Sequence, residues 1–273
     1  MSTLSQAQFL LQQQISDIVS HSDGGWDACA YSRRCPFKET PNEDAIGIIP
    51  VDSETTVFAV ADGCGGMRGG ELASSIALQK LSESIELHEG GPDRLRVAIL
   101  DGIERANAAV QDLKMGAACT IAIVECHRGV IRPYHVGDSM ILVTGIRGKI
   151  RYQSVSHSPV GFAVESGMLG AAEAMHHEDR HIVSNLVGDP RMRIEIGPSI
   201  PLSLCDTVVI ASDGLFDNLG IAEVVERMRK GKLAGSLALL TDLAHERMLG
   251  IEGQPCKPDD LSLVAIRQAK TSM

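Results

Sequence analysis

Short runs of apolar residues, bounded by glycine and polar residues, recur along this chain and predict β-strands. The runs are WDACAYS, AIGIIPV, TTVFAVA, CTIAIVEC, VIRPYHV, SMILVTG, KIRYQSV, TVVIASD and LSLVAIR. The four runs between residues 118 and 152 follow one another, with glycine-containing turns at Gly129 and Gly148. Short strands joined by such turns are typical of antiparallel meanders.

Apolar residues recur at helical spacing in four other segments, which fall into two pairs. The first pair covers residues 71–87 and 93–113, and the second covers residues 221–229 and 236–249. The stripe in the second segment is Leu95, Ile99, Ile103, Ala106, Val110 and Leu113. Many strands with helices in pairs, instead of strict βαβ alternation, predict an α+β layered sandwich with helix pairs on its outer faces.

Two further segments have weaker patterns. Residues 4–19 predict an amphipathic helix that covers the domain, with a partner-binding helix as the alternative, from the spacing of Leu4, Leu11, Ile15 and Ile18. We therefore expect an N-terminal extension at residues 1–24 and a single domain at residues 25–273, since no linker or repeat interrupts the chain.

Residues 157–200 lack a strong period and predict a mobile flap with one short helix near residues 171–178.

The composition limits the class of partner. The chain has 273 residues, 44% of them hydrophobic, so it can bury a sizeable core. Its formal net charge of −10 and pI near 5.4 argue against nucleic acid or an anionic membrane as the main partner, because both need clustered lysine and arginine. A phosphate-bearing substrate would need metal ions to offset the repulsion.

The cysteines and the N-terminus indicate the compartment. Seven cysteines, an odd number without a CxxC pair, favour reduced thiols over a disulfide framework or a zinc knuckle. The first residues lack the basic start and the apolar stretch of a signal peptide, and no run approaches the ~20 apolar residues of a membrane span. We therefore expect a soluble, cytoplasmic protein.

Four aspartate sites lie at or near an end of the predicted strands: Asp62-Gly63, Gly137-Asp138-Ser139, Ser212-Asp213-Gly214 and Asp259-Asp260. Each site alone is more often a strand-ending turn than a ligand, because Asp-Gly is common turn chemistry. The first site also has Asn42-Glu43-Asp44 upstream, and Gly65-Gly66 with a helical stretch downstream. A plain hairpin needs none of these, so we expect the strand ends to aim their carboxylates at one shared point.

Carboxylates and backbone carbonyls make an oxygen-only ligand set, because no HxH, HExxH or CxxC pattern lies nearby. Such a set selects Mg²⁺ or Mn²⁺ over zinc. Two ions that share one aspartate can hold a water between them, lower its pKa and aim it at a phosphorus. Hydrolysis of a phosphate ester then needs no protein nucleophile.

In chain order, NEDA, FAVADGCGG, MGAACT, VGDS, ASDGLFD and DDLSLV resemble the motifs of the metal-dependent serine/threonine protein phosphatases of the phosphatase 2C type, in their bacterial-like form. The resemblance spans about Trp26 to Arg267, nearly the whole chain. It implies a four-layer αββα sandwich, with two antiparallel β-sheets flanked by helix pairs. It also implies hydrolysis of phosphoserine and phosphothreonine on proteins by a hydroxide that bridges two Mn²⁺ or Mg²⁺ ions, with a third ion in several members.

The resemblance assigns the catalytic metal ligands position by position. It implies that Asp62 bridges the two metals and that Gly63 offers its carbonyl to one of them. Asp213 and Asp259 would ligate the other metal. The family has an Asp-Asn pair before the last strand, and Asp260 aligns with the asparagine, so Asp259 is the expected ligand and Asp260 the second candidate.

Outer metal positions follow from the same resemblance. Glu43 and Asp44 would hold metal-bound waters. Asp138 resembles a position that binds a weaker third metal; the alternative is a turn cap that hydrogen-bonds Ser139 or nearby amides. Residues 116–120 would pack closely beside the site.

The chain departs from the family at the place of its phosphate-gripping arginine, four residues before Glu43, where Glu39 stands. Lys38, Arg34 and Arg33 are the candidates to bind phosphate in its stead. A lysine would supply a point charge where an arginine supplies a bidentate fork.

A second departure is Cys64, which stands where some relatives have a histidine proposed as general acid. A thiol is a poor replacement, so a metal-bound water becomes the expected proton donor and Cys64 a small filler in a tight loop. His157 resembles the histidine of a family Asp-His element, with Ser156 in the place of the aspartate, and its role stays open.

Two rival functions share this sequence pattern. One is a catalytically inactive phosphatase fold used as a binding or regulatory module, which the displaced arginine favours. The retained Asp62, Asp213 and Asp259 argue against it. The other rival is a phosphohydrolase for small molecules, which differs only in substrate.

Overall fold

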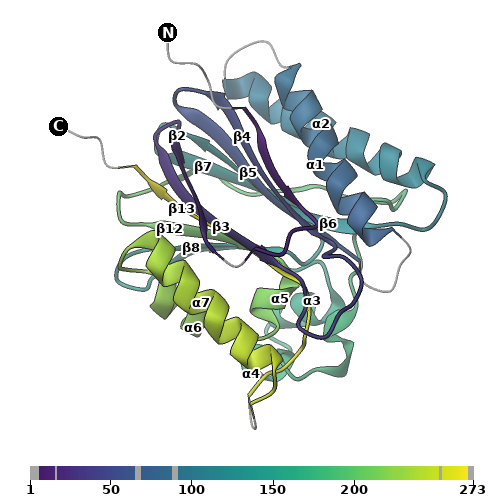
Figure 1. Ribbon diagram of the computed structural model, residues 1–273, viewed down its shortest axis with the longest axis vertical. Coiled ribbons are helices and arrows are strands. Elements are labelled where there is room, and N and C mark those ends of the chain that lie inside the picture. The colour runs from purple at the N-terminus through teal and green to yellow at the C-terminus, as the bar shows by residue number, and fades with distance from the viewer. Residues whose placement is uncertain (1–5, 16, 65–68, 88–91, 252–253, 270–273) are drawn as a thin grey trace.

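The computed structural model describes residues 6–15, 17–64, 69–87, 92–251 and 254–269. Within them, one antiparallel sheet consists of β1 (Gln8–Leu11), β4 (Asp44–Asp52), β5 (Thr55–Gly63), β6 (Cys119–His127), β7 (Val130–Val136), β10 (Glu195–Ile196) and β11 (Ile200–Pro201). The second consists of β2 (Val19–Asp23), β3 (Trp26–Arg33), β13 (Leu261–Gln268), β12 (Thr207–Ala211), β8 (Met140–Thr144) and β9 (Ile150–Gln153). The two sheets face each other (Figure 1).

Helices cover the outer faces of both sheets. The antiparallel pair α1 (Gly70–Glu86) and α2 (Pro92–Asp112) packs on the first sheet, and α6 (Ile221–Met228) and α7 (Leu233–Met248) pack on the second (Figure 1). The short α5 (Asp213–Phe216) lies between β12 and α6 in the chain. The four-layer αββα sandwich expected from the sequence is confirmed.

The central strands are apolar on both faces because each sheet is covered on both sides. In β5, Val57 and Ala59 point to the α1–α2 layer, whereas Phe58 and Val60 point between the sheets. Full burial on both faces explains why TTVFAVA is a continuous apolar run and not an alternating one. Its Asp62 therefore marks the point where the buried strand reaches the end of the sandwich.

The predicted N-terminal helix at residues 4–19 is wrong over its described residues. The segment forms β1, which pairs with β4, and β2, which pairs with β3. Phe9 and Leu11 pack toward the helix layer and Leu10 toward the space between the sheets, so the segment has the period of a strand. The described part of this segment therefore contributes one strand to each sheet of the sandwich and does not form a cover helix; Leu4 lies outside the described residues.

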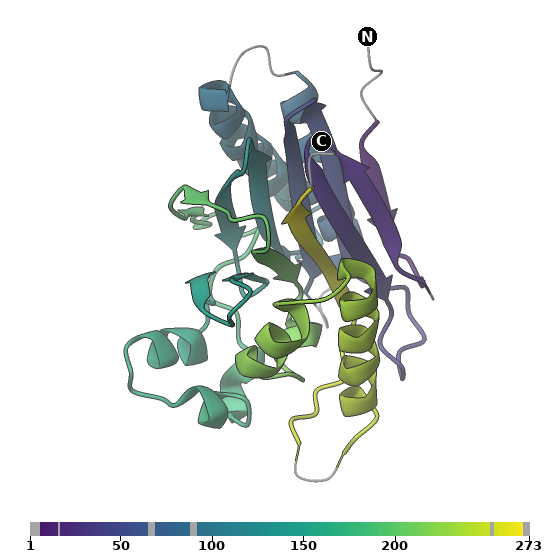
Figure 2. The ribbon, with the colours of Figure 1, turned by 90° about the vertical axis from the view of Figure 1, so that its left-hand side faces the viewer.

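The segment between residues 157 and 200 has more regular structure than its sequence predicts. It contains α3 (Pro159–Glu165), α4 (Ala171–Ala174), a 3-10 turn (Glu178–His181) and the short strands β10 and β11. The predicted helix near residues 171–178 corresponds to α4, whereas α3 was not predicted. These helices lie beside the end of the sandwich that carries α5 (Figure 2). No helix in the described part of the chain is both long and apolar enough to span a membrane.

Candidate active site

The ends of β4 and β5 place two aspartates side by side. Asp44 and Asp62 are directly opposite each other in the antiparallel register. Asp44 is buried, and its Oδ2 accepts a 2.8 Å hydrogen bond from the hydroxyl of Ser212, which follows β12 in the other sheet. This hydrogen bond joins the two sheets at the end where the aspartates lie.

Two more of the aspartate sites lie at this end of the second sheet. Asp213 is the first residue of α5, directly after β12, and Asp259 lies just before β13. The two segments are in close contact, because a β-carbon at Gly214 would lie 2.0 Å from the carbonyl oxygen of Asp260. The neighbouring strands β12 and β13 thus bring Asp213 and Asp259 to one place.

The electrostatics of Asp62 reflect the convergence of these side chains. Although solvent still reaches part of Asp62, the surrounding protein desolvates its carboxylate and raises its pKa well above the usual range. Negative charges raise the pKa further, and they come from Asp44, Asp213, Asp259 and Asp138. Because such repulsion falls off with distance, the structure brings the four aspartate sites of the sequence together.

The same crowding acts on the other members of the cluster. Burial, followed by the charges of Asp213 and Asp217, raises the pKa of Asp138 to about 8. Burial, followed by the charge of Asp213, raises the pKa of Asp259 to about 7. Carboxylates with raised pKa values take up protons or cations at neutral pH, so the cluster is poised to bind cations.

A lysine that the sequence pattern did not single out reaches into the cluster. Lys257 Nζ lies 2.5 Å from Asp213 Oδ2, 2.6 Å from Asp217 Oδ2 and 3.7 Å from Asp259 Oδ2. Asn218 holds the lysine's backbone, donating to its carbonyl at 2.8 Å and accepting from its amide at 2.9 Å. Burial alone would lower the pKa of Lys257, but its contacts with Asp213 and Asp217 raise it above the usual value.

Asp260 has a different environment from its neighbour Asp259. It is buried and accepts hydrogen bonds from the backbone amides of Cys35 and Glu43, both at 2.8 Å, and from Lys38 Nζ at 2.6 Å. Lys38 Nζ also lies 2.5 Å from Glu43 Oε2. Asp260 thus anchors the loop before β4, whereas Asp259 faces Asp213 and Lys257.

The three candidate phosphate-binding residues separate in space. Arg33, at the end of β3, interacts with Tyr31 and lies near His245 of α7. The guanidinium of Arg34 donates to the carbonyl of Glu39 at 3.1 Å. Of the three, Lys38 is the one that, within the described residues, forms an ion pair with a candidate metal-site residue, Glu43.

The turn that carries Asp138 is fixed from two sides. Gly137 has φ 102°, and a β-carbon there would lie 2.5 Å from the side chain of Thr120. Thr120 in turn hydrogen-bonds Ser139, with 2.6 Å between the hydroxyl oxygens. On the other side, the amide of His157 donates to the carbonyl of Gly137 at 3.0 Å, and the amide of Gly137 donates to His157 Nδ1 at 3.1 Å. His157 therefore positions the Asp138 turn.

The tightest group of three candidate metal-ligand atoms in the described residues lies elsewhere: His135, His157 and Glu195, within 4.8 Å of one another. His157 Nδ1 accepts from the amide of Gly137 and from Asn185 Nδ2, so its proton is on Nε2. That Nε2 proton is directed at Glu195 Oε2, 3.1 Å away. A protonated nitrogen has no lone pair for a metal, so this group is a hydrogen-bonded support for the turn.

The end of β5 is closely packed against the start of α1. A β-carbon at Gly63 would lie 2.4 Å from the backbone of Gly70, so only glycine fits. Burial, followed by the charge of Asp138, raises the pKa of Cys64 to about 12, which keeps its thiol protonated at neutral pH. The thiol is thus a filler at this position. Gly65 and Gly66 lie outside the described residues.

A comparison with known protein families decides the identity of this arrangement. Residues 33–239 match the family described as "Protein phosphatase 2C". The chain belongs to the protein phosphatase 2C family. This membership confirms the resemblance seen in the sequence and places the chain among the protein phosphatases.

Individual relatives of the phosphatase 2C family agree with this assignment. The "Protein phosphatase PhpP" of Streptococcus pneumoniae serotype 2 is 26% identical over 197 residues, which are 68% of this chain and 78% of that protein. The structure of the Streptococcus agalactiae serine/threonine phosphatase has a TM-score of 0.77 at 23% identity and covers 89% of this chain and 100% of its own. The catalytic domain of the phosphatase PstP, solved with two manganese ions, has a TM-score of 0.69 at 21% identity and covers 89% and 97%.

The donor chemistry of the cluster fits the divalent cations of the phosphatase 2C family. Its side chains are carboxylates, and hard oxygen ligands of this kind suit Mg²⁺ and Mn²⁺. Burial, followed by mutual repulsion of the carboxylates, raises the pKa values of Asp62, Asp138 and Asp259, and Lys257 offsets that repulsion only in part. The residues present therefore fit Mn²⁺ or Mg²⁺.

Proposed function

We propose that this protein is a Mn²⁺- or Mg²⁺-dependent phosphatase that hydrolyses phosphoserine and phosphothreonine on proteins. The observation that carries the proposal is the convergence of Asp62, Asp213 and Asp259, from strand ends of both sheets, on one cluster. Family membership and the names of the relatives support the substrate class.

In this proposal the carboxylates hold two ions, with a third near Asp138. Asp62 would bridge the two ions, the carbonyl of Gly63 would ligate one, and Asp213 and Asp259 would ligate the other. When bound, such ions lower the pKa of a water and offset charge on the phosphoryl oxygens. The saturation of Asp260 by three donors supports Asp259 as the ligand of the pair.

The protein's own groups would orient this cluster. Ser212 fixes Asp44 by its 2.8 Å hydrogen bond, so that Asp44 and Glu43 can order water around the ions. Lys38 is the candidate to bind the substrate phosphate by its position, because its ion pair with Glu43 places its ammonium beside the proposed metal site. Arg33 and Arg34 are the weaker candidates, since within the described residues they contact other parts of the chain.

A direct assay tests the proposed activity. The purified chain would be incubated with a phosphothreonine peptide and Mn²⁺, with and without EDTA, and phosphate release would be measured. We expect release that chelation abolishes and that excess Mn²⁺ restores. Release that persists in EDTA, or no release at any Mn²⁺ concentration, would refute the proposal.

The inactive binding module remains the second candidate because of Lys257. Its ammonium already contacts Asp213 and Asp217, as it would in a fold that dispenses with ions. Calorimetric titration with Mn²⁺ and turnover measurements on the same sample distinguish the two functions. Binding of Mn²⁺ without turnover, or no binding, would favour the module.

A further inference from the structure

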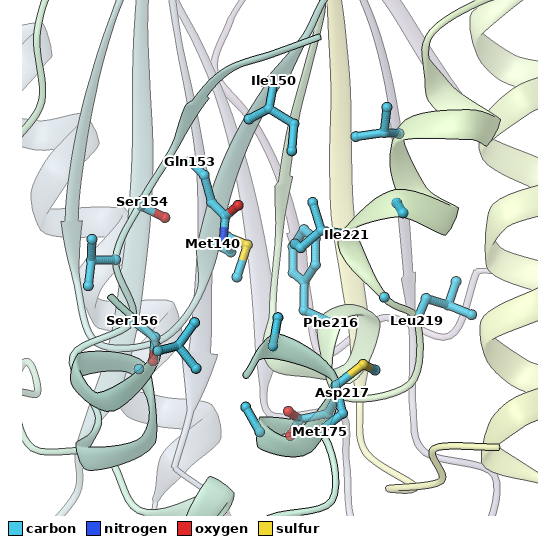
Figure 3. A pocket seen from close by; sticks show the side chains of 18 of the residues that line it. Met140, Ile150, Gln153, Ser154, Ser156, Met175, Phe216, Asp217, Leu219 and Ile221 are labelled. Atoms are coloured by element: carbon cyan, nitrogen blue, oxygen red, sulfur yellow. The ribbon is translucent and has the colours of Figure 1, made fainter. Parts of the chain in front are cut away.

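A large apolar cavity opens beside the carboxylate cluster. It has a volume of about 1090 Å³ and lies between the β8–β9 hairpin, helices α5 and α6, and the segment with α3 and α4. Figure 3 shows Met140 on one side, Phe216 and Ile221 on the other, and Met175 at one end. Pockets that bind organic ligands have volumes of about 300–1,000 Å³, so this cavity is of sufficient size for a ligand.

The cavity shares a wall with the proposed catalytic site. Asp138, Asp213 and Asp217 line it, and the same residues are members of the carboxylate cluster. A phosphorylated residue with its phosphate at the cluster would therefore have its neighbours in the peptide chain at the mouth of the cavity. An extended chain advances about 3.3–3.6 Å per residue, so side chains one to three residues away can reach inside.

The side chains that form the outer wall are not part of the protein's own cores. Val164, Ala174 and Met175 line the cavity, but in the described residues they belong to none of the three hydrophobic clusters of the sandwich. Ile150 lines it from the β8–β9 side and is 42% exposed. Apolar surface of this kind, continuous with a catalytic site, gains free energy when an apolar group covers it.

The charged groups around the cavity offer little to a charged ligand. Arg229 is paired with Glu226, and the guanidinium of Arg180 donates to the carbonyls of Met175 and Cys256. Arg147 and Glu165 also line the cavity, but both are exposed to solvent, so an ion pair with either contributes little. A charged side chain that entered would lose water without gaining a free partner from Arg229 or Arg180. An apolar side chain has no such cost.

We propose that this cavity is a substrate subsite that takes an apolar side chain of the phosphoprotein, located within three residues of the phosphorylated serine or threonine. The inference rests on the proposed function, and it adds the sequence class of the substrate. Phosphoproteins with a leucine, isoleucine, methionine or phenylalanine next to the phosphosite are the substrates that this surface favours. Those with charged flanking residues are poor substrates.

Matched phosphothreonine peptides test the subsite. Each peptide carries leucine or lysine at one position between three residues before and three residues after the phosphothreonine, in an otherwise alanine-rich sequence. At one position at least, we expect kcat/KM to be about tenfold to hundredfold higher for leucine, because burial of a leucine side chain contributes about 1.5–3 kcal/mol. p-Nitrophenyl phosphate serves as a reference substrate that has no flanking residues.

Two variants on the same hairpin connect the preference to the cavity. Ile150→Glu places a charge in the cavity wall, and we expect it to lower the ratio of kcat/KM for the leucine peptide to that for p-nitrophenyl phosphate by at least fivefold, mostly through KM. Ile146→Glu is the matched control, because Ile146 is 50% exposed and does not line the cavity. We expect the control to leave both rates unchanged, and circular dichroism verifies that both variants fold.

The outcomes separate the inference from the function on which it rests. Hydrolysis of p-nitrophenyl phosphate with equal kcat/KM for leucine and lysine peptides at every position would overturn the subsite alone. The subsite would also be overturned if naphthyl phosphate reacted faster than phenyl phosphate while the peptides showed no preference. That result would assign the cavity to an apolar small molecule. No hydrolysis of any substrate with Mn²⁺ would overturn the proposed function and the subsite with it.

Discussion

Replacement of Lys257 by methionine tests how far this lysine compensates the negative charge of the carboxylate cluster in the absence of metal. The lysine lies 2.5 Å from Asp213 and 2.6 Å from Asp217, and its side chain is 21% exposed. The removal of one partner from a buried ion pair costs about 3–5 kcal/mol, so we expect a loss of about 3 kcal/mol at this partly exposed site. For a domain of this size that corresponds to a Tm lower by about 6–12 °C in EDTA.

Thermal unfolding with and without Mn²⁺ measures this effect. In the proposed function Mn²⁺ binds the folded carboxylates, so it should stabilise Lys257→Met more than the unchanged protein, and the two Tm values should converge as the Mn²⁺ concentration rises. Lys257→Arg keeps the charge and should retain most of the stability, whereas Lys149→Met controls for the loss of an exposed lysine. If Lys257→Met in EDTA unfolds at the Tm of the unchanged protein, or if Mn²⁺ shifts both equally, the assigned role of Lys257 is wrong.

Three further substitutions test other parts of the structure. Asp62→Asn should lower the rate of p-nitrophenyl phosphate hydrolysis by more than about 100-fold, since loss of a direct ligand should exceed the 10–100-fold effects of residues that only support ligands; a rate above a tenth of the original would contradict the bridging role. Asp138→Asn should raise the Tm in EDTA at pH 8. The folded protein raises the pKa of Asp138 to about 8, so ionisation of this buried aspartate destabilises the folded state as pH increases, and asparagine does not ionise. An unchanged or lower Tm would argue against the unfavourable environment assigned to the Asp138 carboxylate. His245→Gln should flatten the loss of stability between pH 6.5 and 4, because burial lowers the pKa of His245 to about 4 and the unfolded chain binds the proton first as pH falls. Urea unfolding at pH 6.5 and pH 4 measures the free energy of unfolding. The control His176→Gln, at an exposed histidine, should lose as much stability between the two pH values as the unchanged protein. If His245→Gln also loses as much as the unchanged protein, the assigned role of His245 is wrong.

Much of the fold could be predicted from the sequence because burial dictates the pattern of its central elements. The stripe from Leu95 to Val110 matches α2, and the apolar run before Asp62 matches β5. The prediction failed for residues 8–11, where Gln8 and the glutamines after Leu11 masked an edge strand whose partner is far along the chain. Strand pairing depends on such distant partners more than on local propensity.

The candidate site was predictable to the extent that its residues repeat one chemical type. Asp62, Asp213 and Asp259 share a place at the ends of apolar runs. The neighbouring positions of β12 and β13 bring Asp213 and Asp259 together, and the packing of the two sheets adds Asp62. Lys257 has no such signal, because it lies in a polar segment and meets Asp217 only through the path of the chain before β13. The cavity beside the cluster was equally invisible, since its walls come from segments far apart in sequence.

The N-terminal segment supplies the outermost strand of each sheet, β1 on one and β2 on the other. Along the stretch between them, the amide of Ile15 donates to the carbonyl of Ser32, and Asn42 donates to the carbonyl of Gln13. A truncated version beginning at Trp26 would leave the long strands β3 and β4 with free backbone groups along their outer sides. Unprotected edges of this kind recruit strands from other molecules, so β1 and β2 shield β4 and β3 from such intermolecular pairing.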